Sequence, residues 1–299
     1  MKDVVRFLGI VFLVATIGFS IVACGDGGGG EDPVLTQEML QIPAGSFVRD
    51  GHTITLSAFR MSNFQVTQEL YEAVMGNNPS FFQGTDADKV VAAGEIQGKR
   101  PVEMVSWYDA IVFCNRLSIL EDLTPAYSID GSTDPDVWIS AAGGDIPTIR
   151  NATWDAVTIV EGSTGYRLPT EAQWEFACRA GSNPTWTWHF GNDEAQLENY
   201  AWYEANSNGR TRQVGLKQPN AWGLYDKHGN LSEWVWDWWG NTFPNPADLS
   251  DPRGPSNGDE RVLRGASWLF SAYSLHSATR DSIRPSHRSR NLGFRVVCP

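Results

Sequence analysis

Four cysteines and five histidines are the residues of this sequence best suited to chemistry, and their spacing matches no metal site. Zinc sites need cysteines or histidines in closely spaced pairs, as on a metal-binding helix. Cys114, Cys178 and Cys298 lie far apart, and the apolar neighbours of Cys178 are typical of a buried thiol. The histidines are all isolated: His52, His189, His228, His276 and His287.

Three helices are predicted to position whatever site the chain has. Thr67 is suited to cap a helix over 68–75, whose apolar residues fall on one face. Ser106 begins a second helix with apolar residues at helical spacing. The run Thr-Glu-Ala-Gln that starts at Thr170 is a capping box for a third, which we expect to stop at Gly181.

Strand and loop patterns fill the rest of the chain. Large apolar residues alternate over 234–239, and we expect a core strand there rather than an exposed aromatic platform, because three tryptophans on one face need burial. Glycine and asparagine elsewhere separate short apolar runs, which predicts short strands and long loops. Residues 120–160 are polar and contain Gly, Pro and Asp, which predicts a surface insertion with little regular structure.

The N-terminus has the pattern of a secretory signal. Basic residues precede an apolar run over 7–22, which closes just before Cys24. This resembles a bacterial lipobox, so we expect residues 1–23 to be a lipoprotein signal peptide and Cys24 to carry lipid. Residues 24–32 are glycine-rich and fit a flexible tether. A retained transmembrane helix is the alternative, although the run is short for a full span.

Length and charge limit the function classes. The chain has 299 residues, of which 41% are hydrophobic and 13 are tryptophan, enough for one sizeable core. Composition is even from residue 33 onward, so we expect a single domain over 33–299. The formal net charge of −12 argues against nucleic acid as a partner, because binding to phosphates needs a basic face.

Eight short motifs are spread over most of the chain after residue 40. Among them are Gly-Tyr-Arg-Leu-Pro-Thr-Glu from residue 165 and Gly-Asn-Leu-Ser-Glu-Trp from residue 229. The full set is 42–47, 66–68, 101–107, 165–175, 220–226, 229–234, 264–268 and 293–295. In this order they resemble the formylglycine-generating enzyme family, also called the sulfatase-modifying-factor family. The resemblance implies an α+β, C-type-lectin-like fold of the formylglycine-generating-enzyme type, irregular and loop-rich, with a small antiparallel sheet.

Enzymes of this family oxidise a substrate cysteine with a copper-binding pair of cysteines. The positions that match that pair here are Phe270 and Leu275, and no cysteine between Cys178 and Cys298 replaces them. Soft sulfur ligands hold Cu(I) and exchange with the substrate thiol, and neither side chain offers sulfur. We therefore expect no enzymatic activity; a divergent cysteine-oxidising relative is the alternative.

The resemblance also implies two structural features. Family members often hold calcium, and one such site resembles Asn230 and Glu233, whose oxygen atoms suit Ca²⁺. In the alternative, Asn230 only makes a turn and Glu233 faces solvent or pairs with an arginine. Beyond this structural Ca²⁺, no cofactor is required. Family relatives sometimes bridge comparable regions by a disulfide, which makes Cys114 and Cys298 a candidate pair.

Residues 264–297 combine family motifs with a mixture of aromatic, hydroxyl and arginine side chains that follows no core period, as in a binding surface. This resembles the C-terminal variable region in variable proteins of diversity-generating retroelements, the treponemal ones above all. Their NNC codons exclude Lys, Glu, Gln, Met and Trp, and residues 269–297 contain none of these. At average composition, fifteen sites would lack all five residue types with odds of about one in thirty. An ordinary loop of biased composition is the alternative. The predicted variable, ligand-binding residues are Leu269, Phe270, Ser271, Tyr273, Ser274, His276, Thr279, Asp281, Ser282, Ile283, Arg284, Ser286, His287, Ser289 and Arg290.

These features predict a lipoprotein of the bacterial cell envelope, displayed at the outer surface. Its membrane contact would be the N-terminal lipid. Its variable surface would bind a protein or a glycan. A structural envelope lipoprotein without a specific ligand is the remaining alternative.

Overall fold

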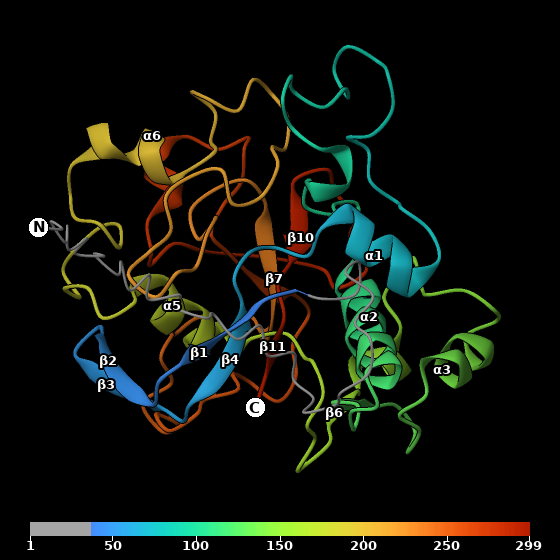
Figure 1. Cartoon of the computed structure of the whole chain (residues 1–299). Helices are drawn as coiled ribbons and strands as arrows, with labels where there is room; N and C mark the ends of the chain where they lie inside the picture. The colour runs from blue at the N-terminus through green and yellow to red at the C-terminus, as the bar shows by residue number, and fades with distance from the viewer. Residues whose placement is uncertain (1–36) are drawn as a thin grey trace, which may run out of the picture.

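The computed structural model describes residues 37–299 (Figure 1), so the predicted signal peptide, Cys24 and the tether lie outside the described range. The helices are α1 (Gln68–Met75), α2 (Trp107–Leu120), α3 (Pro135–Ala141), α4 (Ala152–Asp155), α5 (Glu171–Arg179) and α6 (Leu197–Tyr200), with 3-10 turns η1 (Gln97–Lys99), η2 (Glu194–Gln196) and η3 (Ala272–Leu275). The strands are β1 (Met39–Ile42), β2 (Gly45–Arg49), β3 (His52–Leu56), β4 (Phe59–Ser62), β5 (Tyr127–Ser128), β6 (Thr158–Ile159), β7 (Ser232–Trp238), β8 (Arg261–Arg264), β9 (Arg280–Ile283), β10 (Leu292–Phe294) and β11 (Val297–Cys298). Within residues 37–299, no helix has the length and apolar character needed to cross a membrane.

All three predicted helices are confirmed, together with their caps. Thr67 accepts a hydrogen bond from the main chain of α1, and Ser106 and Asp109 form a reciprocal capping box at α2. Thr170 starts α5 with a second capping box. The helix ends at Arg179, two residues before the predicted Gly181. Side-chain oxygens within three residues satisfy the first free N–H groups of a helix, which is why these starts can be recognised locally.

The predicted core strand at 234–239 is β7, in the interior of a four-stranded sheet of order β10-β7-β8-β9. Its pairing with β10 is parallel, and the other pairs are antiparallel. Trp234 and Trp238 are buried, and Trp236 packs against the main core. Val235, on the opposite face, is buried against Trp174 of α5. Both faces of β7 are therefore covered, which explains why its polar residues Glu233 and Asp237 are buried together with its apolar ones.

A second sheet joins the two ends of the described chain. Strands β1 and β11 both pair antiparallel with β4, in the order β1-β4-β11. Strands β2 and β3 form a separate hairpin, seen at the lower left of Figure 1. Because β11 directly follows β10, this closure also fixes the far end of the segment 264–297.

Residues 120–160 contain more regular structure than predicted. They form α3, α4 and the two-stranded β5-β6 sheet. Trp138 and Trp154 are buried and pack edge to face, with ring centroids 6.1 Å apart, and Trp154 also contacts Tyr108 of α2. The prediction of a surface insertion with little regular structure is wrong for these parts, because the polar composition concealed two core tryptophans. Only the tip of the insertion, around residues 141–150, is largely exposed.

The predicted disulfide between Cys114 and Cys298 is wrong. Cys114 is a free thiol, fully buried on α2, and burial raises its pKa. Cys298 lies in β11, and both residues belong to the main core. A disulfide needs its two sulfur atoms about 2 Å apart, and membership of one core does not provide that geometry. Cys178 is a free buried thiol, as predicted.

Candidate functional site

Residues 264–297, called here the C-terminal segment, run from the end of β8 through η3 and β9 to β10 and the start of β11. Main-chain hydrogen bonds fasten this segment to three distant parts of the fold. They join Glu204 N to Phe270 O at 3.0 Å, Ser277 N to Thr187 O at 2.9 Å, Trp107 N to Pro285 O at 2.9 Å, and Met104 N to Ser289 O at 3.1 Å. Bonds of this kind form whatever side chain is present, proline donors aside.

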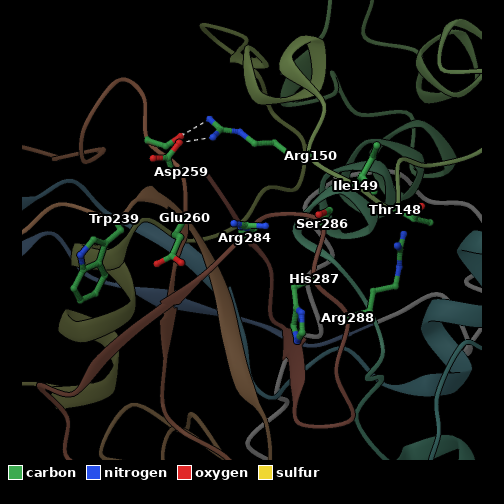
Figure 2. Close-up of a pocket in the computed structure, with 11 residues that line it drawn as sticks. Thr148, Ile149, Arg150, Trp239, Asp259, Glu260, Arg284, Ser286, His287 and Arg288 are labelled. Carbon is green, nitrogen blue, oxygen red and sulfur yellow. Dashed lines mark hydrogen bonds and ion pairs between the residues drawn. The ribbon is translucent and has the colours of Figure 1, made fainter.

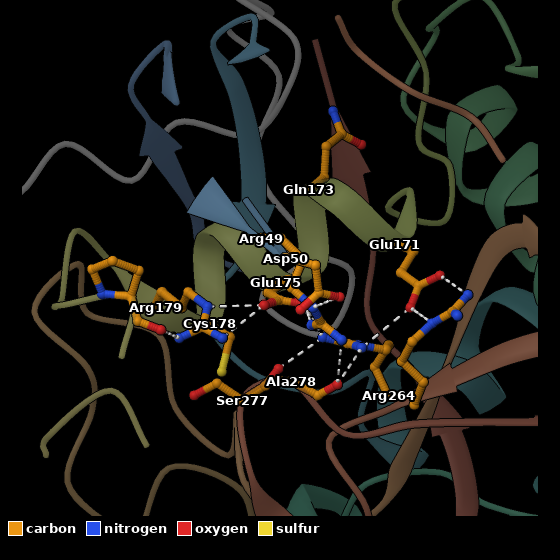
Figure 3. Close-up of polar contacts among 12 residues, drawn as sticks. Arg49, Asp50, Glu171, Gln173, Glu175, Cys178, Arg179, Arg264, Ser277 and Ala278 are labelled. Atoms are coloured by element: carbon orange, nitrogen blue, oxygen red, sulfur yellow. Dashed lines mark hydrogen bonds and ion pairs between the residues drawn. The ribbon is translucent and has the colours of Figure 1, made fainter. Parts of the chain in front are cut away.

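Arg264 is the buried centre of this attachment (Figure 3). Its Nη2 donates to the Glu175 carboxylate at 2.6 Å and to the Ser277 carbonyl at 2.7 Å. Glu175 also pairs with Arg49 and Arg179. Burial by itself would raise the pKa of Glu175, but Arg264, Arg49 and Arg179 bring it below its ordinary value. The turn after η3 is therefore bound to an ionised network on α5.

Two further ion pairs and a tryptophan hold the rest of the segment. Arg280 binds both carboxylate oxygens of Glu171, at 2.6 and 2.8 Å. Arg288 binds Asp109 in the same bidentate way, at 2.7 and 2.9 Å. Trp268 is buried, and its indole N–H donates to the carbonyl of residue 290 at 3.1 Å. Bidentate guanidinium pairs fix orientation as well as position.

The fifteen side chains predicted to vary have a different environment. All of them are half-buried or exposed, with Leu269 at 48% and Tyr273 at 80% exposure. Between them in sequence, Ala272, Leu275 and Pro285 are buried. The segment therefore alternates buried positions, which attach it to the fold, with positions that face outward.

The outward-facing residues surround two separate hollows. The smaller has a volume of about 200 Å³. Its variable lining residues are Phe270, Ser274, Thr279 and Asp281. The larger, of about 1250 Å³, is shown in Figure 2. Its variable lining residues are Arg284, Ser286 and His287. Seven of the fifteen predicted residues thus line two concave surfaces, and the other eight line neither.

Sequence reasoning missed half of the larger hollow. Residues outside the C-terminal segment complete its wall: Thr148, Ile149, Arg150, Trp239, Asp259 and Glu260. They come from the tip of the insertion and from the connection between β7 and β8. No motif or spacing relates these residues to 284–288, so only the folded chain brings them together.

The positions that match the copper-binding cysteines do not fit copper. Leu275 is fully buried, and its carbonyl oxygen lies 2.8 Å from Nδ1 of His228. Phe270 is half-buried beside the smaller hollow. Neither provides a sulfur atom, and Cu(I) requires soft ligands of that kind.

Two histidines that look isolated in the sequence are stacked in the structure. The rings of His189 and His228 lie 5.1 Å apart, so the prediction that all histidines are isolated is wrong for this pair. Burial lowers the pKa of His189 to about 4 and that of His228 well below its ordinary value. Both imidazoles are therefore neutral at physiological pH. Among residues 37–299, no group of three His, Cys, Asp or Glu side chains could hold a metal ion.

Asn230 and Glu233 do not fit the calcium ion expected at that position. Glu233 is fully buried, and its carboxylate accepts hydrogen bonds from Arg295 at 2.7 and 2.9 Å and from the Trp174 indole at 2.6 Å. The side chain of Asn230 bonds the main chain of Arg212 through both its oxygen and its nitrogen. Asn230 makes a left-handed turn, with φ of 60°. The structure thus shows the alternative, a turn at Asn230 and an ion pair at Glu233.

This architecture can be compared with known proteins. A family model described as "Sulfatase-modifying factor enzyme 1-like domain" matches residues 29–299. The chain belongs to this family. As a member of the sulfatase-modifying-factor family, it has the α+β, C-type-lectin-like fold that the motifs implied.

Three proteins similar to this chain are a solved structure and two relatives known by sequence. The structure titled "Treponema denticola variable protein 1" is 42% identical, with a TM-score of 0.76, and the match covers 87% of this chain and 94% of that one. The protein named "Chaperone protein LppX" of Paenibacillus barcinonensis is 31% identical over 96% of this chain and 98% of its own length. The formylglycine-generating enzyme of Bos taurus is 27% identical over 90% of this chain and 76% of the enzyme.

Proposed function

We propose that this chain is a non-catalytic family member that displays a diversified ligand-binding surface at the bacterial cell envelope. The division within the C-terminal segment carries the proposal. Its main chain is bound to the fold by backbone hydrogen bonds and buried frame residues, while the fifteen outward-facing side chains are not buried. Such a segment tolerates exchange of those side chains, as antibody loops do. Similarity to a protein named variable protein 1 supports this function.

The other parts of the proposal concern anchoring, location and partner. Lipid on Cys24 holds the protein to the membrane and displays it at the outer surface. The ligand is a protein or a glycan, and the formal net charge of −12 argues against nucleic acid. Mass spectrometry of the native membrane fraction should find an acylated Cys24; an unacylated N-terminus would contradict the anchor.

The absence of catalysis follows from residues 270 and 275. Without a thiol pair, no copper–thiolate centre forms and no mixed disulfide with a substrate cysteine can be made. Incubation with copper and a cysteine-containing sulfatase peptide should leave the cysteine unchanged. Conversion to formylglycine above a protein-free control would favour the divergent-oxidase alternative.

The gene itself provides the sharpest test of diversification. A near-copy of the sequence that encodes 264–297 should lie close to a reverse-transcriptase gene, with adenine in the copy wherever the two differ. Mismatches spread equally over all four bases, or no copy at all, would show that the surface is not diversified in this way. A structural envelope lipoprotein would then be the better description.

A further inference from the structure

The larger hollow has walls of two kinds (Figure 2). Arg284, Ser286 and His287 form one wall and belong to the predicted variable set. The second wall contains Ile149, Arg150 and Trp239, among other residues that lie outside the C-terminal segment. We call this second wall the constant wall. Any ligand that enters the hollow contacts both.

Contacts of Arg150 hold the constant wall. Arg150 pairs with Asp155 at 2.7 Å, donates to the Gly258 carbonyl at 2.9 Å, and forms an ion pair with Asp259. Gly258 packs so closely on Trp238 that an added Cβ would lie 3.0 Å from that side chain. These contacts fix the loop beside Ile149, whose side chain is nevertheless 76% exposed. An apolar side chain presented on a fixed loop loses little further entropy when a partner covers it.

Two of the three arginines that line the hollow are paired with carboxylates. Arg150 is paired with Asp259, and Arg288 with Asp109. Glu260 accepts a hydrogen bond from the Ser282 hydroxyl at 2.6 Å. This pairing disfavours a highly charged polymer as the ligand.

Apolar and arginine contacts remain for a partner to use. Ile149 and Trp239 offer apolar surface, and the guanidinium of Arg284 lies in the variable wall. Tryptophan and arginine are enriched at the energetic centres of protein interfaces, whereas lysine is depleted and is absent from this lining.

The size and shape of the hollow favour a protruding segment over a small molecule. Its volume of about 1250 Å³ exceeds the range of roughly 300–1,000 Å³ that is typical for small ligands. A second hollow of about 760 Å³ adjoins it and shares Thr148, Ile149 and Arg288. Together they form an elongated concave surface around the insertion tip. Concave surfaces of this kind accept loops that project from a folded partner.

We propose that this groove binds a protruding loop of a folded partner protein, and that Ile149, Arg150 and Trp239 contact every such partner. The inference rests on the proposed function and names the partner class for the same surface. The variable wall selects among partners, and the constant wall contributes contacts that do not change with the variable residues. The insertion therefore belongs to the binding site and is more than a surface excursion.

A phage library that displays short, disulfide-closed peptide loops is the probe. Loops are selected on the whole chain and then tested on Ile149→Asp, His287→Asp and Val137→Asp. Val137 is 51% exposed on α3 of the same insertion and does not line this groove. Ile149→Asp and His287→Asp should each weaken binding about tenfold or more, and Val137→Asp should leave it unchanged. Ile149 is mostly exposed, so its substitution should leave the melting temperature near that of the parent.

The outcomes separate this inference from the proposed function. Selected loops that still bind Ile149→Asp but no longer bind His287→Asp would contradict the proposed role of the constant wall. The proposed role of the variable surface would stand. Loops that ignore both, but respond to Tyr273→Asp, would place binding outside this groove and also overturn the inference. If no loops are selected, or if only glycans on an array bind, a loop-shaped protein partner is excluded. Loops that ignore every variable position would count against the proposed function as well.

Discussion

Two sets of residues in the C-terminal segment lie next to one another in the sequence but differ in how far their side chains are exposed. Trp268 and Leu269 are adjacent, yet the first is 4% exposed and the second 48%. Arg264 and Arg284 have the same side chain, but Arg264 is buried among carboxylates while Arg284 lines an open hollow. Side chains of the first set determine where the segment lies. Those of the second set cover a backbone that is already fixed.

The comparison shows how a surface can change without loss of fold. Stability depends on buried apolar area and on the satisfaction of buried polar groups. Here both are supplied by frame residues such as Arg264, Trp268 and Phe294, and by main-chain hydrogen bonds. None of the outward-facing residues is fully buried, although Phe270 and Ile283 pack at the edges of core clusters.

Removal of Arg264 should give one of the largest effects. Arg264→Ala leaves Glu171 and Glu175 buried with less compensating charge, and should lower the free energy of unfolding by about 3–5 kcal/mol. Arg284→Ala, the matched arginine of the exposed set, should change it by about 0.5 kcal/mol or less. Urea unfolding followed by tryptophan fluorescence measures both. Equal losses of unfolding free energy would show that the buried and exposed arginines contribute alike to stability.

Trp268 and Leu269 allow the stability contributions of a buried and an exposed side chain to be compared at adjacent positions. Trp268 packs edge to face on Phe82, with ring centroids 5.3 Å apart. Trp268→Ala should therefore cost about 3–5 kcal/mol, as truncation of a large buried aromatic does. Leu269→Ala should cost about 0.5 kcal/mol or less. Thermal melts of the two variants test this, and a costly Leu269→Ala would show that Leu269 belongs to the core.

The stability of the fold should also depend on pH, through the titration of Asp237. Burial and the nearby Glu171 carboxylate raise the pKa of Asp237 to about 8, above its ordinary value of 3.8. A raised pKa in the folded state means that the contribution of this group to stability is complete below about pH 4. It is lost as the pH rises through 8.

Asp237→Asn should flatten this dependence, because the amide stays neutral at every pH. At pH 9 we expect the variant to be more stable than the parent by at least about 1.4 kcal/mol, the equivalent of one pKa unit. Melting temperatures measured from pH 4 to pH 9 provide the check. Parallel curves for parent and variant would contradict the assignment.

The smallest change in stability is expected for a variant in which five outward-facing residues are exchanged together. Simultaneous exchange of Leu269, Tyr273, Thr279, Ile283 and His287 for other residues that NNC codons encode should leave the melting temperature nearly unchanged. Each of these side chains is half-buried or exposed, and substitutions at exposed sites usually change stability by about 0.5 kcal/mol or less. Ile283 packs against the main core, so its exchange tests the prediction hardest. Calorimetry gives the value. An unfolded product would show that the outward-facing set supports the core.

The sequence by itself determined the features that depend on local interactions. The starts of α1, α2 and α5 are set by caps that reach three residues along the chain. The strand at β7 follows from its alternating tryptophans, and the order of motifs gave the family and its fold. The irregular chemistry of 269–290 predicted side chains that do not pack in a core. All fifteen are half-buried or exposed, but Phe270 and Ile283 do pack against core clusters.

Only the tertiary structure decided which distant residues meet. Arg150 and Asp259 are 109 residues apart, and Glu233 and Arg295 are 62 residues apart. The first pair builds the constant wall of the larger hollow, and the second occupies the place expected for calcium. Such contacts form because the packed layers exclude water and force buried charges to find partners, and no local pattern records which partner lies within reach.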